Sequence, residues 1–285
     1  MLFDPILNKI KQGESIMSEL DSAVCITSLR ATAEALSGIH TPGTIDSPNS
    51  LITALAAKKL GGKLVDRVVI YNPDAVALWL YQKYTEMFCE ALLASDLALP
   101  MRSVMPSVTP VCFASMYTGV MPAVHGIQKY EKPVLKAETL FDSFVAFGKR
   151  VAIVSTAGDS ISKIFLEREM DYYIYDSVDQ VNEKALALIE EDAYDLIVIY
   201  NGNYDGTMHK CGTESPQALD ALRQNITFYA ELVKKIRVCW PSHRVLYGFC
   251  PDHGCHEIDA ECGSHGLDMP EDMNVIHFYG ILEEE

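Results

Sequence analysis

Basic residues are scarce in this sequence. Its 23 Lys and Arg residues are outnumbered by 39 Asp and Glu residues, and the formal net charge of −16 argues against a nucleic-acid polymer or an anionic membrane as partner. Apolar runs of the roughly 18 residues that a membrane span needs are missing too. Residues 1–14 lack the uninterrupted apolar core of a signal peptide, because charged residues such as Asp4 and Lys9 interrupt them. We therefore expect a cytoplasmic protein.

The eight cysteines lack the pattern of a disulfide framework. They are scattered from Cys25 to Cys262 in a chain without an export signal, so we expect reduced, mostly buried thiols. A late group of Cys250, Cys255 and Cys262 is interleaved with histidines and is a candidate structural zinc site. Its spacings, with four and six intervening residues, differ from the two-residue spacing of common zinc ribbons. A zinc-stapled binding protein stays an alternative.

The length and composition predict a sizeable buried core. A chain of 285 residues that is 49% hydrophobic suffices for one large domain or two modest ones. Residues 1–60 are predicted to form a helical N-terminal segment, with helices over 6–16 and 51–60 and a loop over 38–50. Residues 61–285 are predicted to form the main domain.

The remaining chain alternates apolar runs with helical stretches. β-rich runs are followed by short polar loops, and the predicted strands span 65–71, 150–155, 194–200 and 244–249. Helix-forming stretches lie between or after them, over 74–93, 181–191 and 215–236. This alternation predicts an α/β fold with a predominantly parallel sheet sandwiched between helices.

Polar side chains follow three of the predicted strands, where ligands bind in such sheets. They are Asn72 with Asp74, Asn203 with Asp205, and Asp252 with His253. His209 lies four residues after Asp205, so one helical turn brings both onto the same face, and His265 follows in a Gly-Ser-His-Gly segment. Three acids and three imidazoles supply two mixed oxygen and nitrogen sites, which suit zinc or manganese better than magnesium or calcium.

One segment carries a family resemblance. Residues 105–127 include Thr118-Gly119, then Pro122, then His125-Gly126-Ile127. This stretch resembles the nucleophile segment of type I phosphodiesterases and nucleotide pyrophosphatases in the alkaline phosphatase superfamily. Counting back from Thr118 by the family's interval leads to Thr109. The other motifs follow in the family's order: an acid after the first strand, Asp-x-x-x-His, Asp-His-Gly and a lone histidine.

The resemblance implies that residues 61–285 form an alkaline phosphatase-like catalytic domain with a threonine nucleophile and two divalent metal ions, zinc first and manganese second. Carried over onto this sequence, it assigns one metal to Asp205, His209 and His265, the other to Asp74, Asp252 and His253, and the nucleophile to Thr109. The hydroxyl would attack phosphorus and form a covalent phosphothreonine. The expected partner is a small phosphorylated substrate, and an oligomer is compatible with the sequence.

Two departures from the family pattern leave alternatives open. The family has an Asp-Gly pair after the first strand where this chain has Asn72-Pro73-Asp74, so either Asn72 or Asp74 is the aligned ligand. Where diesterases present an asparagine to the phosphoryl group, this chain has Lys129 and Tyr130 as candidate contacts. The predicted function is therefore a metal-dependent phosphodiesterase or nucleotide pyrophosphatase. A phosphomonoesterase and a non-catalytic zinc or phosphate-ligand binding protein are the alternatives.

Overall fold

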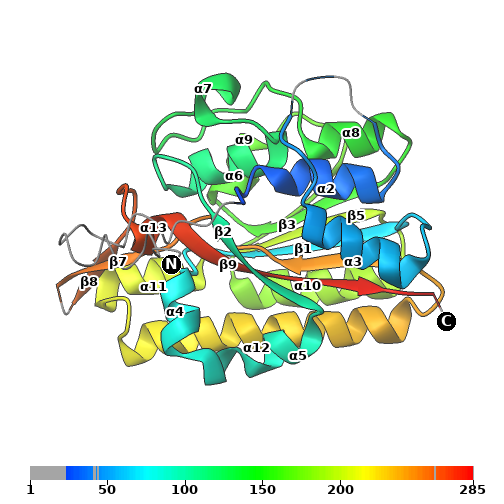
Figure 1. The fold of residues 1–285 in the computed structure, drawn as a ribbon. Coiled ribbons are helices and arrows are strands. Elements are labelled where there is room, and N and C mark those ends of the chain that lie inside the picture. Colours follow the sequence, from blue (N-terminus) through cyan, green and yellow to red (C-terminus); the bar gives the residue numbers. More distant parts are fainter. Residues whose placement is uncertain (1–23, 41–42, 44, 260, 285) are drawn as a thin grey trace, which may run out of the picture.

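A seven-stranded sheet lies between two layers of helices (Figure 1). The computed structural model describes residues 24–40, 43, 45–259 and 261–284. The strand order is β2-β9-β6-β1-β5-β3-β4; neighbouring pairs from β6 to β4 are parallel, and β9 runs antiparallel to both β6 and β2. The strands of the sheet are β1 (Arg67–Pro73), β2 (Leu97–Arg102), β3 (Val151–Thr156), β4 (Asp171–Tyr175), β5 (Leu196–Asn201), β6 (Val245–Phe249) and β9 (Asn274–Leu282). A separate hairpin pairs β7 (His256–Asp259) with β8 (Cys262–Ser264). The predicted α/β fold with a mostly parallel sheet is thus confirmed.

Each face of the sheet is covered by its own helices. Above the sheet in Figure 1 lie α2 (Ser28–Leu36), α3 (Ser50–Leu60), α6 (Thr109–Thr118), α7 (Pro122–His125), α8 (Leu140–Ala146) and α9 (Ser160–Ile164). Below it lie α4 (Leu78–Lys83), η2 (Thr85–Phe88), α5 (Cys89–Ala94), α10 (Val178–Glu191) and α12 (Pro216–Cys239), while α11 (Asn203–Cys211) and α13 (Pro270–Met273) lie near the hairpin. In the part of the chain that the structure describes, no helix combines the length and apolarity needed to cross a membrane.

The strand sequences explain why both faces are covered. In β1, Val68 and Ile70 belong to the apolar cluster between the sheet and α6. Val69 and Tyr71 belong to the apolar cluster on the opposite face, between the sheet and α12. Successive side chains of a strand point to opposite faces, so a run that is apolar throughout needs a cover on each side. The strand is accordingly buried from Val68 onward.

The helix predicted over 74–93 is wrong as a single element. The chain first runs through residues 74–77 without helix, and Ala77 forms an isolated bridge with Val275 of β9. Three short helical pieces follow, α4, η2 and α5, with Tyr84 outside helical geometry between the first two. The strands β2, β4 and β9 were absent from the sequence prediction.

The described residues before residue 61 pack onto the same core as the rest of the chain. Ile26, Leu29 and Ile52 join the apolar cluster of α6, and buried Arg30 donates to the carbonyl oxygens of Thr118 (3.0 Å) and Glu138 (2.8 Å). The predicted helix over 51–60 is confirmed as α3. The predicted helix over 6–16 lies outside the described residues, and the division at residue 60 stays a prediction.

Candidate metal centre and nucleophile

Three neighbouring parallel strands bring the acidic side chains to one edge of the sheet. β1 lies between β6 and β5, so the carboxyl ends of all three point the same way. Asp74 directly follows β1, and its N–H donates to the carbonyl oxygen of Asn201 at the end of β5 (2.9 Å). Asp252 lies three residues beyond β6, and Asp205 lies in the first turn of α11, which follows β5.

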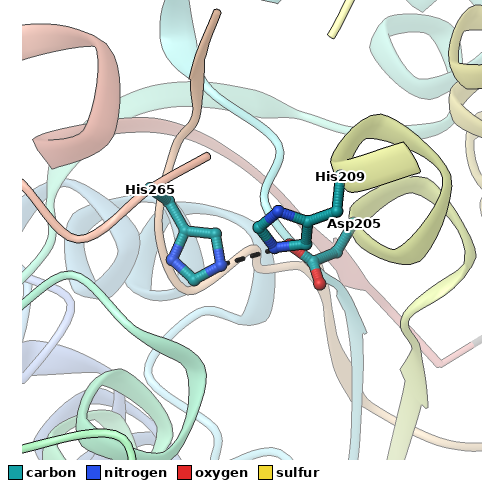
Figure 2. A group of neighbouring side chains, drawn as sticks. All are labelled: Asp205, His209 and His265. Carbon is teal, nitrogen blue, oxygen red and sulfur yellow. Dashed lines mark ion pairs between the residues drawn. The ribbon is translucent and has the colours of Figure 1, made fainter. Parts of the chain in front are cut away.

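The first group consists of Asp205, His209 and His265 (Figure 2). Asp205 and His209 share one face of α11, while His265 follows the hairpin strand β8. The Nε2 atoms of His209 and His265 lie 3.3 and 3.4 Å from Asp205 Oδ1. One potential ligand atom from each residue therefore points to a common position at the surface end of the site.

The second group, Asp74, Asp252 and His253, is buried. His253 Nε2 lies 3.3 Å from Asp74 Oδ1 and 3.4 Å from Asp252 Oδ2. The rings of His253 and His265 stack with centroids 4.0 Å apart, so the two groups are neighbours. All six side chains that the sequence nominated are thus brought together in two sets of three.

Thr109 lies against the second group. Its Oγ1 is 3.4 Å from Asp74 Oδ2 and 3.2 Å from His253 Nε2, and the residue is 4% exposed. Thr109 is the first residue of α6, which has Pro110 in its first turn. The positive end of a helix favours negative charge at this position.

Backbone contacts fix the orientation of the three imidazoles. The Nδ1 atoms of His209, His253 and His265 lie 2.9 to 3.0 Å from the carbonyl oxygens of Gly263, Gly254 and Ser107. Because a carbonyl oxygen only accepts, each Nδ1 carries the hydrogen, and the Nε2 of a neutral ring directs a lone pair at the carboxylates. This is the arrangement of metal-ligating histidines, whose other nitrogen donates to a carbonyl or carboxylate.

Four carboxylate oxygens in the site lack hydrogen-bond partners among the described residues. These are Oδ1 of Asp74, Oδ1 of Asp205 and both carboxylate oxygens of Asp252. An unpaired buried carboxylate is costly, and coordination to a divalent cation removes that cost. The donor set of oxygens and imidazole nitrogens therefore fits zinc or manganese.

Burial shifts the protonation of the second group. It raises the pKa of Asp74 to about 7, with a further contribution from the charge of Asp205, and it raises the pKa of Asp252 well above its usual range. Burial also lowers the pKa of His253 well below its usual value. In the first group, burial alone would raise the pKa of Asp205, but the imidazoles beside it outweigh burial and lower it. Cation binding to the second group therefore has to displace protons at neutral pH.

Comparison with known proteins relates one part of the chain to a family. The family model of type I phosphodiesterases and nucleotide pyrophosphatases matches residues 73–144, the stretch that runs from the end of β1 through Thr109 and α6. This stretch of the chain is therefore similar to that family. A search of curated proteins by sequence gives no match.

Solved structures share the fold at low sequence identity. Phosphonoacetate hydrolase from Sinorhizobium meliloti, in complex with phosphonoformate, is 18% identical with a TM-score of 0.51, over 69% of this chain and 59% of that chain. Human ectonucleotide pyrophosphatase/phosphodiesterase 5 is 11% identical with a TM-score of 0.59, over 75% and 87% of the two chains. An inactive variant of its murine counterpart in complex with AMP is 15% identical with a TM-score of 0.51, over 67% and 57%. This chain thus spans under two thirds of the hydrolase it resembles.

The geometry selects Asp74 over Asn72 as the member of the buried group. The Asn72 amide donates to the carbonyl oxygen of Cys250 (2.6 Å) and accepts from the hydroxyl of Tyr117 (2.5 Å). These two hydrogen bonds connect β1 to the end of β6 and to α6. The side-chain oxygen of Asn72 therefore already has a hydrogen-bond partner. Asp74 keeps an unpaired oxygen within reach of His253.

The predicted phosphoryl contacts are exposed. Lys129 Nζ lies 3.3 Å from a carboxylate oxygen of Glu131, and the ring of Tyr130 lies beneath Lys132 Nζ at 5.5 Å. Neither Lys129 nor Tyr130 belongs to the two groups formed by the described residues, so their contact with a phosphoryl group stays a prediction.

Tyr200 is a site residue that the sequence reasoning missed. Its hydroxyl donates to Asp74 Oδ2, and its ring packs edge-on against Phe113 of α6. A Cβ at Gly202 would lie 2.8 Å from the Tyr200 hydroxyl, so glycine keeps this space open. The sequence does hold a signal for this position: Tyr200 is the last residue of the apolar run before Asp205, at the end of a predicted strand where site residues gather.

The cysteines lie outside both groups. All eight are free thiols, and none belongs to a metal-competent group among the described residues. Cys255 Sγ approaches the hydroxyl of Tyr204 (3.5 Å), and Cys112 is buried in α6, where burial raises the pKa of its thiol. His125 is held by its own turn: its Nε2 lies 2.8 Å from Ser115 Oγ, and its Nδ1 accepts from the N–H of Ile127 (3.2 Å). The contacts of Cys112, Cys255 and His125 are thus structural ones within the fold.

Proposed function

We propose that the protein hydrolyses a small phosphate ester, with Thr109 as the nucleophile and two divalent cations as cofactors. The observation that carries the proposal is the position of the Thr109 hydroxyl, within 3.4 Å of Asp74 and 3.2 Å of His253, beside buried carboxylates that lack partners among the described residues. The similarity of residues 73–144 to the type I phosphodiesterase and nucleotide pyrophosphatase family supports the reaction class.

The six clustered side chains would hold the cations, zinc first and manganese second. Bound there, the cations supply Lewis-acid activation of the hydroxyl and neutralise negative charge on the phosphoryl group. Asp205, His209 and His265 would hold one cation, and Asp74, Asp252 and His253 the other. The Nδ1 contacts to backbone carbonyls place the hydrogen of each neutral ring on Nδ1, so that Nε2 is the nitrogen available to a cation.

The chemical steps follow from the position of Thr109. Its Oγ1 attacks phosphorus as the bond to the leaving oxygen breaks, and both Asp74 Oδ2 (3.4 Å) and His253 Nε2 (3.2 Å) lie within reach of the hydroxyl proton. The first turn of α6 stabilises the negative charge that gathers beside Thr109. Water then cleaves the phosphothreonine, which releases a phosphate compound and restores the hydroxyl.

The substrate is proposed to be a phosphodiester or a nucleotide pyrophosphate. The structurally similar murine protein was solved with AMP and the bacterial hydrolase with phosphonoformate, both small phosphorus compounds. A phosphomonoester is the second candidate, because this chain has Lys129 and Tyr130 where diesterases present an asparagine. Rates on bis(p-nitrophenyl) phosphate and p-nitrophenyl phosphate separate the two candidates.

Variants of Thr109 test the nucleophile. We expect Thr109→Ala to lower turnover at least a hundredfold while the metal content is unchanged, and Thr109→Ser to retain part of the activity. Mass spectrometry after a rapid acid quench should detect phosphate on the peptide that contains Thr109. Ser107→Ala is the matched control, since this hydroxyl is two residues away and contacts only the carbonyl oxygen of Leu267 among the described residues (3.3 Å). Full activity in Thr109→Ala, or its loss in Ser107→Ala alone, would overturn the assignment.

A further inference from the structure

Buried polar side-chain atoms without partners gather at a second place, away from the metal ligands. Among the described residues, carboxylate oxygens in the metal centre form one set, and amide atoms of Asn201, Asn203 and Asn225 form another. The remaining unpartnered atoms are Ser37 Oγ, Asn49 Nδ2 and Trp240 Nε1. Buried amides in proteins are normally hydrogen-bonded, and leaving one unpaired costs about 1 to 3 kcal/mol. A group of them therefore indicates a missing partner.

These asparagines come from different elements and meet below the sheet. Asn201 ends β5, Asn203 begins α11, Asn225 lies on α12 and Asn182 lies on α10. Helices α10 and α12 both lie below the sheet in Figure 1. The amide nitrogen of Asn201 donates to the side-chain oxygen of Asn182 (2.9 Å) and to Tyr71 (3.0 Å), which leaves its oxygen without a partner. Asn225 is 1% exposed, and neither its nitrogen nor its oxygen has a partner among the described residues.

A cavity of about 360 Å³ is lined by three of these asparagines. Asn182, Asn203 and Asn225 contribute polar groups, and Leu186 and Phe228 contribute apolar wall. The volume lies at the small end of the range of about 300 to 1,000 Å³ found for ligand pockets. Helices α10 and α12 cover the sheet face opposite α6, so the cavity lies on the other side of the sheet from the helix of the nucleophile (Figure 1).

We propose that this cavity binds a small neutral molecule rich in hydroxyl groups, such as a polyol or a monosaccharide. Asn225 needs both a donor for its oxygen and an acceptor for its nitrogen. A hydroxyl group supplies both, whereas an ammonium group cannot accept. The C–H faces of such a ligand fit the apolar wall formed by Leu186 and Phe228.

Charge around the cavity argues against an anion. Asp179 and Glu231 line it, and the guanidinium of Arg223, the cation in its lining, lies 3.7 Å from Asp220. A phosphorylated molecule would therefore be repelled, and the site differs in chemistry from the metal centre. Asn203 lies two residues before Asp205, so a ligand here would contact the first turn of α11.

Binding to the full chain tests the proposal with D-glucose and myo-inositol as probes. Saturation-transfer NMR and calorimetry should detect at least one of them, with binding unchanged in Thr109→Ala and in the presence of a metal chelator. Asn225→Leu, which keeps a similar side-chain volume, should weaken binding at least about tenfold. Because it removes an unpaired buried amide, it should leave the melting temperature equal to or above that of the wild type. Gln217→Leu, on an exposed position of α12 outside the cavity, should bind both probes as the wild type does.

Three results would overturn it. If neither probe binds the wild type, or Asn225→Leu melts at a lower temperature, the amides are satisfied by ordered water rather than by a ligand. If the chelator abolishes binding, the probe occupies the metal centre. If Asn225→Leu binds the probes as tightly as the wild type, the asparagine group is not the site.

Discussion

Gly254 is the position where one added methyl group should destroy half of the metal centre. It directly follows His253, and its carbonyl oxygen receives the hydrogen bond that orients the His253 ring. A Cβ at Gly254 would lie 2.0 Å from the backbone oxygen of Glu271 and 3.0 Å from the Cβ of Ala77. Reaching ordinary contact at 3.4 Å requires a shift of about 1.4 Å, and the neighbour is backbone rather than a flexible side-chain end.

A shift of that size exceeds what coordination tolerates, since ligand distances in metal sites vary by about 0.2 Å. We therefore expect Gly254→Ala to lose the cation held by Asp74, Asp252 and His253 and to be destabilised by about 1 to 3 kcal/mol. Elemental analysis and urea unfolding measure the two effects. Two equivalents of metal at wild-type affinity in Gly254→Ala would refute the reasoning.

Gly206 provides the matched control, because it directly follows the ligand Asp205. A Cβ there meets nothing within 4 Å, and the residue lies inside α11. Replacement of a glycine inside a helix by alanine typically stabilises by up to about 1 kcal/mol where the added Cβ has room. Gly206→Ala should therefore keep both cations, with stability equal to or slightly above that of the wild type.

Two further predictions concern a tyrosine and a histidine. Tyr200→Phe removes the hydroxyl that donates to Asp74, so the metal affinity of the second group should fall about tenfold. Competition with a chromophoric chelator measures this affinity. The control is Tyr173→Phe on the edge strand β4, and an equal loss of affinity there would show that the effect is not local. Burial lowers the pKa of His277 to about 4, so below its ordinary value of 6.5 the unfolded chain takes up a proton that the folded chain refuses. The free energy of unfolding of the wild type should therefore fall relative to that of His277→Gln as the pH drops from 6.5 to 4.5, by roughly 1.4 kcal/mol per pH unit. Urea unfolding measures this difference at each pH, and a difference that stays constant would contradict the prediction.

The site could be predicted from the sequence because parallel strands end at one edge of a sheet. Asp74, Asp205 and Asp252 each follow an apolar run, and the structure places their strands side by side. The family motif then supplied Thr109, which packs against that edge. Local sequence signals therefore sufficed wherever a residue's position followed from strand direction alone.

The missed features depend on contacts between distant segments. Residues 74–93 have helical composition, yet Ala77 pairs with Val275 of β9, a strand that the pattern reasoning did not detect. From the sequence alone, Asn72 and Asp74 are both candidates for the ligand after the first strand. Only the contacts of Asn72 with Cys250 and Tyr117 distinguish their roles.

Several expectations stay predictions. The roles of Lys129 and Tyr130, the identity of the metal, the cytoplasmic location and the oligomeric state all depend on molecules or surroundings that the fold of one chain does not specify. The donor set combines imidazole nitrogens with carboxylate oxygens, and this combination favours zinc or manganese as the bound metal.

The most direct test of the central claim is the rate of phosphodiester hydrolysis during a zinc titration of chelator-treated, dialysed protein. We predict no turnover of bis(p-nitrophenyl) phosphate without metal and a rise that saturates at two equivalents of zinc per chain, because both groups of three side chains have to be filled. Turnover that is independent of zinc and manganese, or its absence at saturation with either metal on both diester and monoester substrates, would contradict the account.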